Sequence, residues 1–399
     1  MLILVANLGS TSFKYKLFDT ARDEAVLAQG AADRIGEAES AWSLKADGVD
    51  RDGTAGLPDH GAAIELHLKE LVDAGVLDAI ESLGAVGFKA VHGGPISGAV
   101  RVDERVLETM QQFADVAPAH NPPYIEAMRA FGERLPGVPQ VAAFETAFHQ
   151  TIPLKRQAYA VPYEWTQMGI RRYGFHGASH RYVATRMAEI APDARRVINC
   201  HLGGSSSICA IADGQSVATS MGLTPQSGLP QSGRVGDFEI FALLKLNAAG
   251  ISTEEALQRL GKESGLLGIS GISSDMRDIE QAAAGGDARS QLAIDVYAEA
   301  IRHYIGAYMA VLNGVDAICF TGGIGQNGKA LREAVLRDFD YAGVKLDAKA
   351  NEAADANAES RIDAADSGVA LWVLPTNEEL IVARQTVAVL EATTNTTNN

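Results

Sequence analysis

Short apolar runs alternate along the chain with longer stretches of helical periodicity. The runs are typical of buried strands and lie at 2–6, 85–91, 141–144, 197–200, 317–320 and 370–374. Residues 60–76 instead place Ile64, Leu68 and Leu71 on one helical face. Further helices are expected at 238–246, 254–260 and 290–312, one from Asn121-Pro122-Pro123 and one from Thr376. Strands alternating with helices predict an α/β fold.

A turn rich in glycine and hydroxyl residues occurs twice in matching contexts. Asn7–Ser12 follows the first apolar run, and His201–Ser206 follows the run at 197–200. A second apolar segment comes after each turn. Glycine lets backbone N–H groups approach an anion closely, and small hydroxyls add donors. The repetition predicts a duplicated fold with two hairpins that hold phosphate.

Composition narrows the class of protein. The chain has 399 residues and a formal net charge of −16, which argues against a general binder of nucleic acid or membrane surfaces. Its three cysteines lie in apolar segments without metal-site spacing and are expected to be reduced core thiols. No run approaches the roughly twenty apolar residues of a membrane span. We expect a cytoplasmic protein.

One glycine-rich segment allows several interpretations. Gly323–Gly328 matches the dinucleotide fingerprint G-x-G-x-x-G, with Asp347 as a candidate ribose ligand. Gly323–Lys329 also fits G-x-x-x-x-G-K, but Ala330 replaces the hydroxyl residue that would hold Mg²⁺. A dinucleotide unit usually opens its domain, whereas this segment lies near the end of the chain. We favour a loop that starts a helix close to a nucleotide.

Several cationic residues are candidates for chemistry, each with a simpler alternative. His176 lies between glycines beside two arginines, where a functional role competes with a structural one. Arg234 lies in a glycine-flanked turn that is otherwise a surface turn. Lys14 and Lys89 occupy strand-like positions, where a lysine could also extend its ammonium group to solvent. Near the last helix, Thr376 and Glu379 have capping-box spacing, which leaves Glu378 for a metal.

Taken together, these motifs resemble the acetate kinase family over nearly the whole chain. The motifs are Asn7-x-Gly9-Ser10-x-Ser12-x-Lys14, Val91-His92-Gly93-Gly94, Ala119-His120-Asn121-Pro122-Pro123, Thr146-Ala147-Phe148-His149, Tyr173-Gly174-Phe175-His176-Gly177, Ser264-Gly265-Leu266-Leu267-Gly268, Asp275-x-Arg277-Asp278, Gly322-Gly323-Ile324-Gly325-x-Asn327 and Pro375-Thr376-Asn377-Glu378-Glu379-Leu380. Nine motifs in family order are specific, although each alone is weak.

The resemblance implies a duplicated two-domain α/β architecture, similar to actin, the sugar kinases and the heat-shock chaperone ATPases, with an active-site cleft between the domains. An N-terminal lobe over 1–148, rejoined by about 378–399, would accompany a nucleotide-binding lobe over 149–377. The implied reaction is reversible, Mg²⁺-dependent phosphoryl transfer from ATP to acetate, with Mn²⁺ as a possible substitute metal. Acetyl phosphate as product would serve acetyl-CoA biosynthesis. The resemblance also favours a homodimer.

The resemblance assigns roles to individual residues. Asn7 and Glu378 would hold the metal, while Glu145, His176 and Arg234 would be catalytic. Lys89 and His120 would bind the substrate. The implied nucleotide-binding residues are Lys14, His201, Leu202, Gly203, Gly204, Ser205, Asp275, Met276, Arg277, Gly323, Ile324, Gly325, Gln326 and Asn327.

The chain also departs from the family pattern near these positions. Lys89 stands where the family has an arginine that engages the substrate carboxylate, and Glu145 replaces an aspartate. Gly204 and Ser205 change the family's His-Leu-Gly-Asn-Gly. Further departures are Glu239 for aspartate, Ile240 for proline and Gln326 for glutamate. Three outcomes fit: an acetate kinase of altered efficiency, a kinase for another short carboxylate or phosphoryl donor, and a catalytically weak nucleotide-binding paralogue.

Overall fold

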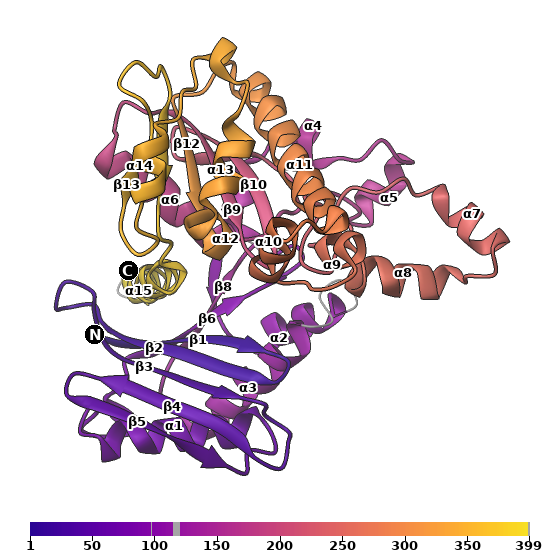
Figure 1. Ribbon diagram of the computed structural model, residues 1–399. Coiled ribbons are helices and arrows are strands. Elements are labelled where there is room, and N and C mark those ends of the chain that lie inside the picture. The colour runs from indigo at the N-terminus through magenta and orange to yellow at the C-terminus, as the bar shows by residue number, and fades with distance from the viewer. Residues whose placement is uncertain (97, 115–119, 398–399) are drawn as a thin grey trace. The chain divides into compact units, whose positions relative to one another are not determined.

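The chain forms two compact α/β units in a computed structural model that describes residues 1–96, 98–114 and 120–397 (Figure 1). Unit 1 comprises Met1–Ala147 together with Asn377–Asn399, and unit 2 comprises Phe148–Thr376. Each unit is built on one mixed β-sheet.

The sheet of unit 1 has eight strands in the order β5-β4-β3-β2-β1-β6-β8-β7. The strands are β1 (Leu2–Gly9), β2 (Ser12–Asp19), β3 (Ala25–Asp33), β4 (Ser40–Ala46), β5 (Val49–Ala55), β6 (Ala85–Ala90), β7 (Ala99–Arg101) and β8 (Gln140–Phe144). The helices are α1 (His60–Asp73), η1 (Ile80–Ser82), α2 (Glu104–Gln112), α3 (Asn121–Arg134) and α15 (Glu378–Thr397).

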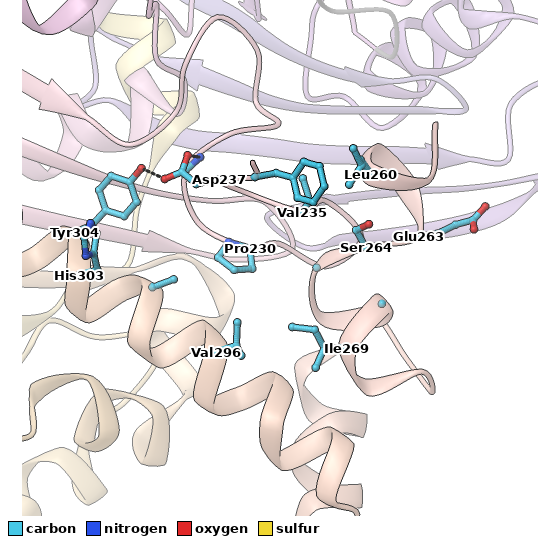
Figure 2. Close-up of a pocket in the computed structure, with 15 residues that line it drawn as sticks. Pro230, Val235, Asp237, Leu260, Glu263, Ser264, Ile269, Val296, His303 and Tyr304 are labelled. Atoms are coloured by element: carbon cyan, nitrogen blue, oxygen red, sulfur yellow. Dashed lines mark hydrogen bonds between the residues drawn. The ribbon is translucent and has the colours of Figure 1, made fainter. Parts of the chain in front are cut away.

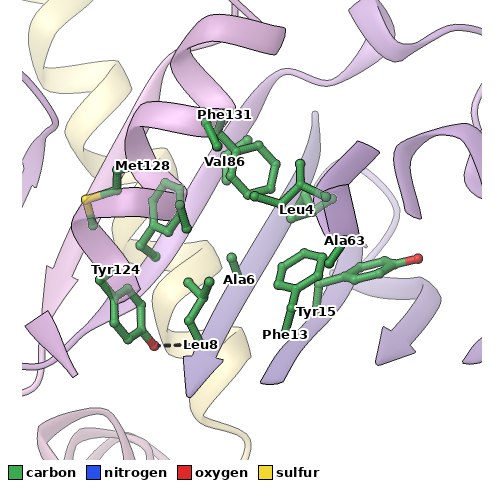
Figure 3. Close-up of a cluster of buried hydrophobic side chains, with 14 of the residues drawn as sticks. Leu4, Ala6, Leu8, Phe13, Tyr15, Ala63, Val86, Tyr124, Met128 and Phe131 are labelled. Carbon is green, nitrogen blue, oxygen red and sulfur yellow. Dashed lines mark hydrogen bonds between the residues drawn. The ribbon is translucent and has the colours of Figure 1, made fainter. Parts of the chain in front are cut away.

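Strand β1 shows how the alternation of side chains buries both faces of this sheet. Leu4 and Leu8 face the core formed with α1 and α3 (Figure 3). Ile3 and Val5 point the other way and pack with Val382 of α15. Because successive side chains of a strand point to opposite faces, an unbroken apolar run supplies core side chains on both faces of the sheet.

Unit 2 has a six-stranded sheet in the order β11-β10-β9-β12-β14-β13. Its strands are β9 (Arg196–Leu202), β10 (Ser206–Ala212), β11 (Gln215–Thr219), β12 (Ala317–Thr321), β13 (Ser360–Arg361) and β14 (Ala370–Val373). The helical segments are η2 (Ala147–Thr151), α4 (Leu154–Gln157), α5 (Tyr163–Gln167), α6 (Gly177–Ile190), α7 (Ala242–Ala248), α8 (Thr253–Lys262), α9 (Gly265–Ser270), α10 (Met276–Ala284), α11 (Ala288–Leu312), α12 (Gly322–Asn327), α13 (Lys329–Leu336), η3 (Asp340–Ala342) and α14 (Ala348–Ala353).

Helices cover both faces of this second sheet. The long helix α11, orange in Figure 1, places Ile301 and Ile305 in a core with Ile198 of β9. On the other face, Val183 and Met187 of α6 pack with residues of β9, β10 and β12. A sheet covered on both faces needs apolar side chains on both, which explains its continuous apolar strands.

The two units repeat one core of five strands. In unit 1 the order is β3-β2-β1-β6-β8, and in unit 2 it is β11-β10-β9-β12-β14. In unit 1, β1 pairs antiparallel with β2 and parallel with β6. In unit 2, β9 pairs antiparallel with β10 and parallel with β12. The predicted duplicated α/β architecture is therefore confirmed.

Three details differ from the sequence-based expectations. The apolar pattern predicts no strand over 45–59, yet Val49–Ala55 forms the edge strand β5, which pairs with β4 although its alternate side chains are exposed. Helix α7 begins at Ala242 rather than at Phe238. Helix α15 is capped by Asn377, whose Oδ1 accepts the Leu380 N–H at 3.2 Å, so the predicted Thr376–Glu379 capping box is wrong.

The described cysteines, Cys200, Cys209 and Cys319, are buried thiols. None of the helices within the described ranges combines the length and apolar content that crossing a membrane requires.

Candidate active site

In unit 1, charged groups gather where β6 and β8 end and α15 begins. Lys89 lies on β6, Glu145 directly follows β8, and Glu378 is the first residue of α15. The Lys89 ammonium forms an ion pair with Glu378, and its Nζ lies 3.9 Å from Oε1 of Glu145. Both carboxylates belong to buried residues: Glu145 is 5% exposed and Glu378 is 9% exposed. One cation therefore links two carboxylates brought from distant parts of the sequence.

Burial and attraction act in opposite directions on Lys89. Burial by itself disfavours the charged ammonium, but the carboxylates of Glu378 and Glu145 outweigh it and raise the pKa of Lys89 above its usual value. The side chain remains a cation at any physiological pH. Lys89 thus holds one positive charge beside the two carboxylates of Glu145 and Glu378.

Tyr124 orients the amide of Asn7 beside this cluster. Its hydroxyl donates to Oδ1 of Asn7 at 3.3 Å and accepts the N–H of Leu8 at 3.1 Å (Figure 3). Burial raises the pKa of Tyr124, so the hydroxyl keeps its proton and remains a donor. Tyr124 is not predicted from the sequence, because its position one turn into α3 gives no sign of a contact with β1.

The donor set of unit 1 fits a magnesium ion. Among the described residues, no group of three or more His, Cys, Asp or Glu side chains is arranged to hold a metal. Mg²⁺ does not need one, because it commonly takes one or two carboxylates and completes its octahedron with water and substrate phosphate. Glu378, Glu145 and the Asn7 carbonyl provide oxygen ligands of that kind. Lys89 would compete with the metal for Glu378.

Two other predicted residues of unit 1 lie around this cluster. Lys14 is exposed on β2, directly across from Asn7 in the antiparallel register. With Lys16 and Lys45 it lines a cavity of about 310 Å³. His120 precedes α3, and its carbonyl accepts the N–H of Tyr124 at 3.2 Å. Lys14 therefore adds positive charge next to the metal-ligand candidate Asn7.

In unit 2, the turn at 203–205 is held from both sides. The Ser206 hydroxyl accepts the Gly203 N–H at 3.2 Å and donates to the Gly203 carbonyl at 2.9 Å. Gly322, at the start of α12, packs against the strand before the turn, where an added Cβ would lie 2.5 Å from the carbonyl oxygen of Leu202. The turn is thus rigid, and Gly204 at its tip is exposed.

Arg234 reaches this turn from its own loop. Its Nη1 donates to Oγ of Ser205 at 3.2 Å and to Oε1 of Gln231 at 3.1 Å. Ser205 also donates to Gln231 at 2.8 Å, so the three side chains form one network. Burial lowers the pKa of Arg234, but a guanidinium stays charged in proteins. Gln231, which orients the arginine, is not predicted from the sequence.

A group of histidines surrounds the same strands. His176 caps α6 in the left-handed conformation with φ of 56°, and its ring lies 4.2 Å from that of His201 between centroids. Nδ1 of His176 contacts Oγ of Ser207 at 2.9 Å, and Nδ1 of His201 contacts Oγ of Ser179 at 2.8 Å. Two predicted residues far apart in sequence, His176 and His201, are therefore neighbours in the fold.

The remaining predicted nucleotide residues form two segments. Gly322–Asn327 folds as the short helix α12, with Gly323 exposed at its first turn. Asp275 caps α10, and its carboxylate accepts from the backbone and side chain of Arg277. The Arg277 side chain and then its N–H lower the pKa of Asp275 to about 2. Met276 is buried in the core, so it would contribute to a ligand through its backbone.

A separate cavity of about 660 Å³ in unit 2 contains none of the predicted site residues (Figure 2). It lies between α9, α11 and the loop after β11, where the Tyr304 hydroxyl donates to Asp237 at 2.5 Å. Val235 borders this cavity, whereas Arg234 next to it contacts the turn at 203–205. The loop therefore separates the cavity from the network of Arg234, Ser205 and Gln231.

Comparisons with known proteins place the chain in one family over nearly its whole length. The family model of the acetokinase family matches residues 2–384. An acetate kinase of Clostridium botulinum (strain 657 / Type Ba4) is 46% identical over 394 residues, which are 97% of this chain and 98% of that one. The crystal structure of Porphyromonas gingivalis acetate kinase has a TM-score of 0.90 at 38% identity and covers 98% of this chain and 99% of its own.

A propionate kinase from Francisella tularensis subsp. tularensis SCHU S4 has a TM-score of 0.89 at 36% identity and covers 96% of this chain and 98% of its own. The match to the family model extends over both units and includes all the residues discussed above. Since sequence and fold agree over nearly the full length, the chain is an enzyme of the acetokinase family.

Proposed function

We propose that this enzyme transfers the γ-phosphoryl group of ATP to acetate, reversibly, giving acetyl phosphate and ADP with Mg²⁺ as the metal. The observation that carries the proposal is the match to the family model over residues 2–384, which includes every residue to which we assign a role. The two side-chain clusters described above support it, because each provides what one part of this reaction requires.

Unit 1 supplies the groups for the acceptor and the metal. Lys89 is the cation for the acetate carboxylate, and His120 helps to line the acceptor site. Asn7 and Glu378 would hold Mg²⁺, with Glu145 beside them. When bound, Mg²⁺ would neutralise phosphate oxygens and align the reactants. The acetate is ionised near neutrality because a carboxyl pKa is about 4, so no strong general base is required.

Unit 2 supplies the groups for the donor. The N–H groups of the turn at 203–205 are placed to hold phosphate, while Arg234 and His176 stabilise the moving phosphoryl group. The adenosine would be held by 275–277 and 323–327. Phosphoryl transfer has a loose transition state with charge on the equatorial oxygens, so positioned donors and cations account for most of the catalysis.

A panel of acceptors tests the proposal. Purified enzyme is mixed with ATP, Mg²⁺ and formate, acetate, propionate or butyrate, and the acyl phosphate is trapped as its hydroxamate. We expect the highest kcat/KM with acetate. Nucleotide binding without turnover on any acceptor would identify a catalytically weak paralogue and refute the proposal.

A second candidate is a kinase with preference for propionate. Two observations favour keeping it: a propionate kinase is among the similar solved structures, and Lys89 offers a single ammonium where a two-pronged arginine is expected. A higher kcat/KM with propionate than with acetate in the same panel would select it.

We also propose a homodimer, supported by an apolar surface near α7 and α8. Ile240, Phe241, Leu244 and Leu257 are 67%, 73%, 67% and 57% exposed. Ile240 and Leu257 also line a groove of about 540 Å³. Large exposed apolar patches mark interaction sites. Phe241→Asp with Leu244→Asp should halve the mass measured by light scattering, whereas Val26→Asp on the exposed side of β3 should not; an unchanged mass in the double variant would oppose this interface.

Mn²⁺ is expected to replace Mg²⁺ because it accepts similar oxygen ligands. A cytoplasmic location fits three buried thiols and an ATP-dependent reaction. The net charge of −16 gives no support for nucleic acid or a membrane surface as a partner. The acetyl phosphate formed would serve acetyl-CoA biosynthesis.

A further inference from the structure

Behind His176 lies a buried chain of polar side chains that the proposed roles do not use. It runs from Asn199 on β9 through His180 of α6 to Ser207 on β10 and ends at His176. We propose that this chain is a hydrogen-bond relay that fixes His176 as the tautomer with its proton on Nε2, so that Nε2–H donates to the transferring phosphoryl group. This inference rests on the proposed function and makes Asn199, His180 and Ser207 positioning residues.

The relay begins with a histidine that carries one ring proton. His180 is fully buried, and burial, followed by the nearby His149 and His201, lowers its pKa well below the usual value. The His149 and His201 rings lie 5.6 and 6.3 Å away, and Ser207 and Asn199 contact its two nitrogens. A neutral imidazole has one donor nitrogen and one acceptor nitrogen. If one nitrogen of His180 accepts a hydrogen bond, the other must therefore donate one.

Asn199 determines which nitrogen of His180 carries the proton. Its Nδ2 lies 2.8 Å from Nδ1 of His180. An amide nitrogen can only donate, so Nδ1 of His180 must accept and Nε2 must carry the proton. If Asn199 presented its oxygen instead, every donor along the chain would reverse, and a neutral His176 would carry its proton on Nδ1.

Ser207 connects His180 to His176 through its hydroxyl. Its Oγ lies 2.8 Å from Nε2 of His180 and 2.9 Å from Nδ1 of His176. A hydroxyl has one hydrogen and can accept two bonds. Because Oγ accepts from His180, its hydrogen is directed to Nδ1 of His176. The proton of a neutral His176 is then on Nε2.

The fold places these groups in one row. Asn199 and Ser207 have the same alternation on β9 and β10 as Val197 and Ile211, which face α6. Ser207 pairs with His201 across the hairpin. His176 and His180 are one helical turn apart, so they present their rings to the same strand residues.

The tautomer matters because the phosphoryl group is an anion. A donor at Nε2 stabilises its equatorial oxygens, whereas a lone pair there would repel them. In a histidine-dependent protease, a substitution that leaves the geometry intact but gives the wrong tautomer reduces kcat by about 10⁴-fold. The relay thus allows a neutral imidazole to act as a donor.

Nuclear magnetic resonance of the wild-type enzyme tests the relay without any activity measurement. In protein labelled with ¹⁵N at histidine, long-range ¹H–¹⁵N correlations distinguish protonated from unprotonated ring nitrogens. We expect His176 to have an unprotonated Nδ1 and a protonated Nε2. Protonation at Nδ1 of neutral His176 would overturn the proposal, whether or not acetate is the substrate.

Kinetics provides the second measurement. Ser207→Ala should lower kcat about 100-fold with KM for ATP nearly unchanged, and Ser207→Thr, which keeps the hydroxyl, should restore most of it. Ser216→Ala is the matched control, because Ser216 is also buried and contacts Nδ1 of a histidine, His149, at 2.9 Å outside the relay. Equal losses in Ser207→Ala and Ser216→Ala would overturn the relay, whereas failure of the wild type on acetate would overturn only the proposed function.

Discussion

The two units carry the same five-stranded core but different chemistry at the strand ends. In unit 1 the groups are charged: Lys89 lies between the carboxylates of Glu145 and Glu378. In unit 2 they are imidazoles and hydroxyls, as in the contacts of His176 and His180 with Ser207. The scaffold fixes where side chains can meet, and the residues at those positions decide what they do.

The contrast follows from what each cluster is proposed to hold. Fixed carboxylates suit a divalent cation, and a lysine suits the carboxylate of a small acid. Phosphate oxygens need many donors in fixed directions, which hydroxyls, imidazoles and the half-buried Arg234 provide. Substitutions in either unit test this division of roles.

Arg234→Ala should have the largest effect, because it removes the guanidinium that reaches the turn at 203–205. We expect kcat to fall by about 10³-fold or more, with little change in KM for ATP, since charge on the phosphoryl group develops in the transition state. Steady-state kinetics provides the measurement. Arg195→Ala, which removes an exposed arginine paired with Asp213, is the control. Turnover close to wild type would remove Arg234 from the site.

A buried histidine of unit 1 should make stability depend on pH. His67 packs against Phe13, Tyr15 and Trp42, and burial lowers its pKa from 6.5 to about 4. The unfolded chain binds the proton below pH 6.5 and the folded chain does not, so the free energy of unfolding falls as pH falls towards 4. The linked loss is about 3 kcal/mol.

His67→Leu should remove this loss while keeping an apolar side chain in the core. Urea unfolding at several pH values between 4 and 7 gives the comparison. His149 of unit 2, whose pKa burial also lowers to about 4, remains in the variant and should leave part of the dependence. An unaltered slope in the variant would show that His67 does not contribute.

Gly322→Ala tests the rigid support of the unit 2 turn. Gly322 has φ of +78°, and an added Cβ would lie 2.5 Å from the Leu202 carbonyl. We expect a loss of about 2 kcal/mol in stability and weaker ATP binding, because the strand before the turn must shift. Gly323→Ala is the matched control, since its Cβ would meet no atom within 4 Å. Similar melting temperatures for both variants would refute the steric argument.

The smallest effect is expected in unit 1. Lys89→Arg should lower KM for acetate about threefold, because a guanidinium binds a carboxylate through two parallel hydrogen bonds. Glu145→Asp in the same chain shortens the neighbouring carboxylate and gives the larger head group room. Kinetics with acetate and propionate compare both variants. An unchanged or higher KM for acetate in both would argue against Lys89 as the carboxylate contact.

The sequence was sufficient where local pattern determines structure. The hairpins β1–β2 and β9–β10, helix α1 and the alternation of strands and helices follow from apolar periodicity and glycine-rich turns. The hairpin β4–β5 was missed because its residues are largely polar, and its pairing depends on tertiary neighbours. The cap of α15 was assigned to the wrong residue because two capping patterns overlap there.

The residues of the candidate site were likewise predicted only in part. Motifs identified His176 and His201, which the fold places 4.2 Å apart between ring centroids. Tyr124, Ser207 and Asn199 were missed, because their contacts depend on cross-strand register and on helix rotation. Spacing along the chain does not contain that information.

Unit 1 is made of two separate parts of the chain, and this affects the order in which the protein can be completed. Helix α15 packs on β1, β6, β7 and β8, yet it is synthesised only after all of unit 2. Val382 therefore covers the second face of the unit 1 sheet only after α15 has been synthesised. Glu378 arrives with the same helix, so a nascent chain would assemble the proposed phosphate-holding unit before it could assemble the proposed metal site.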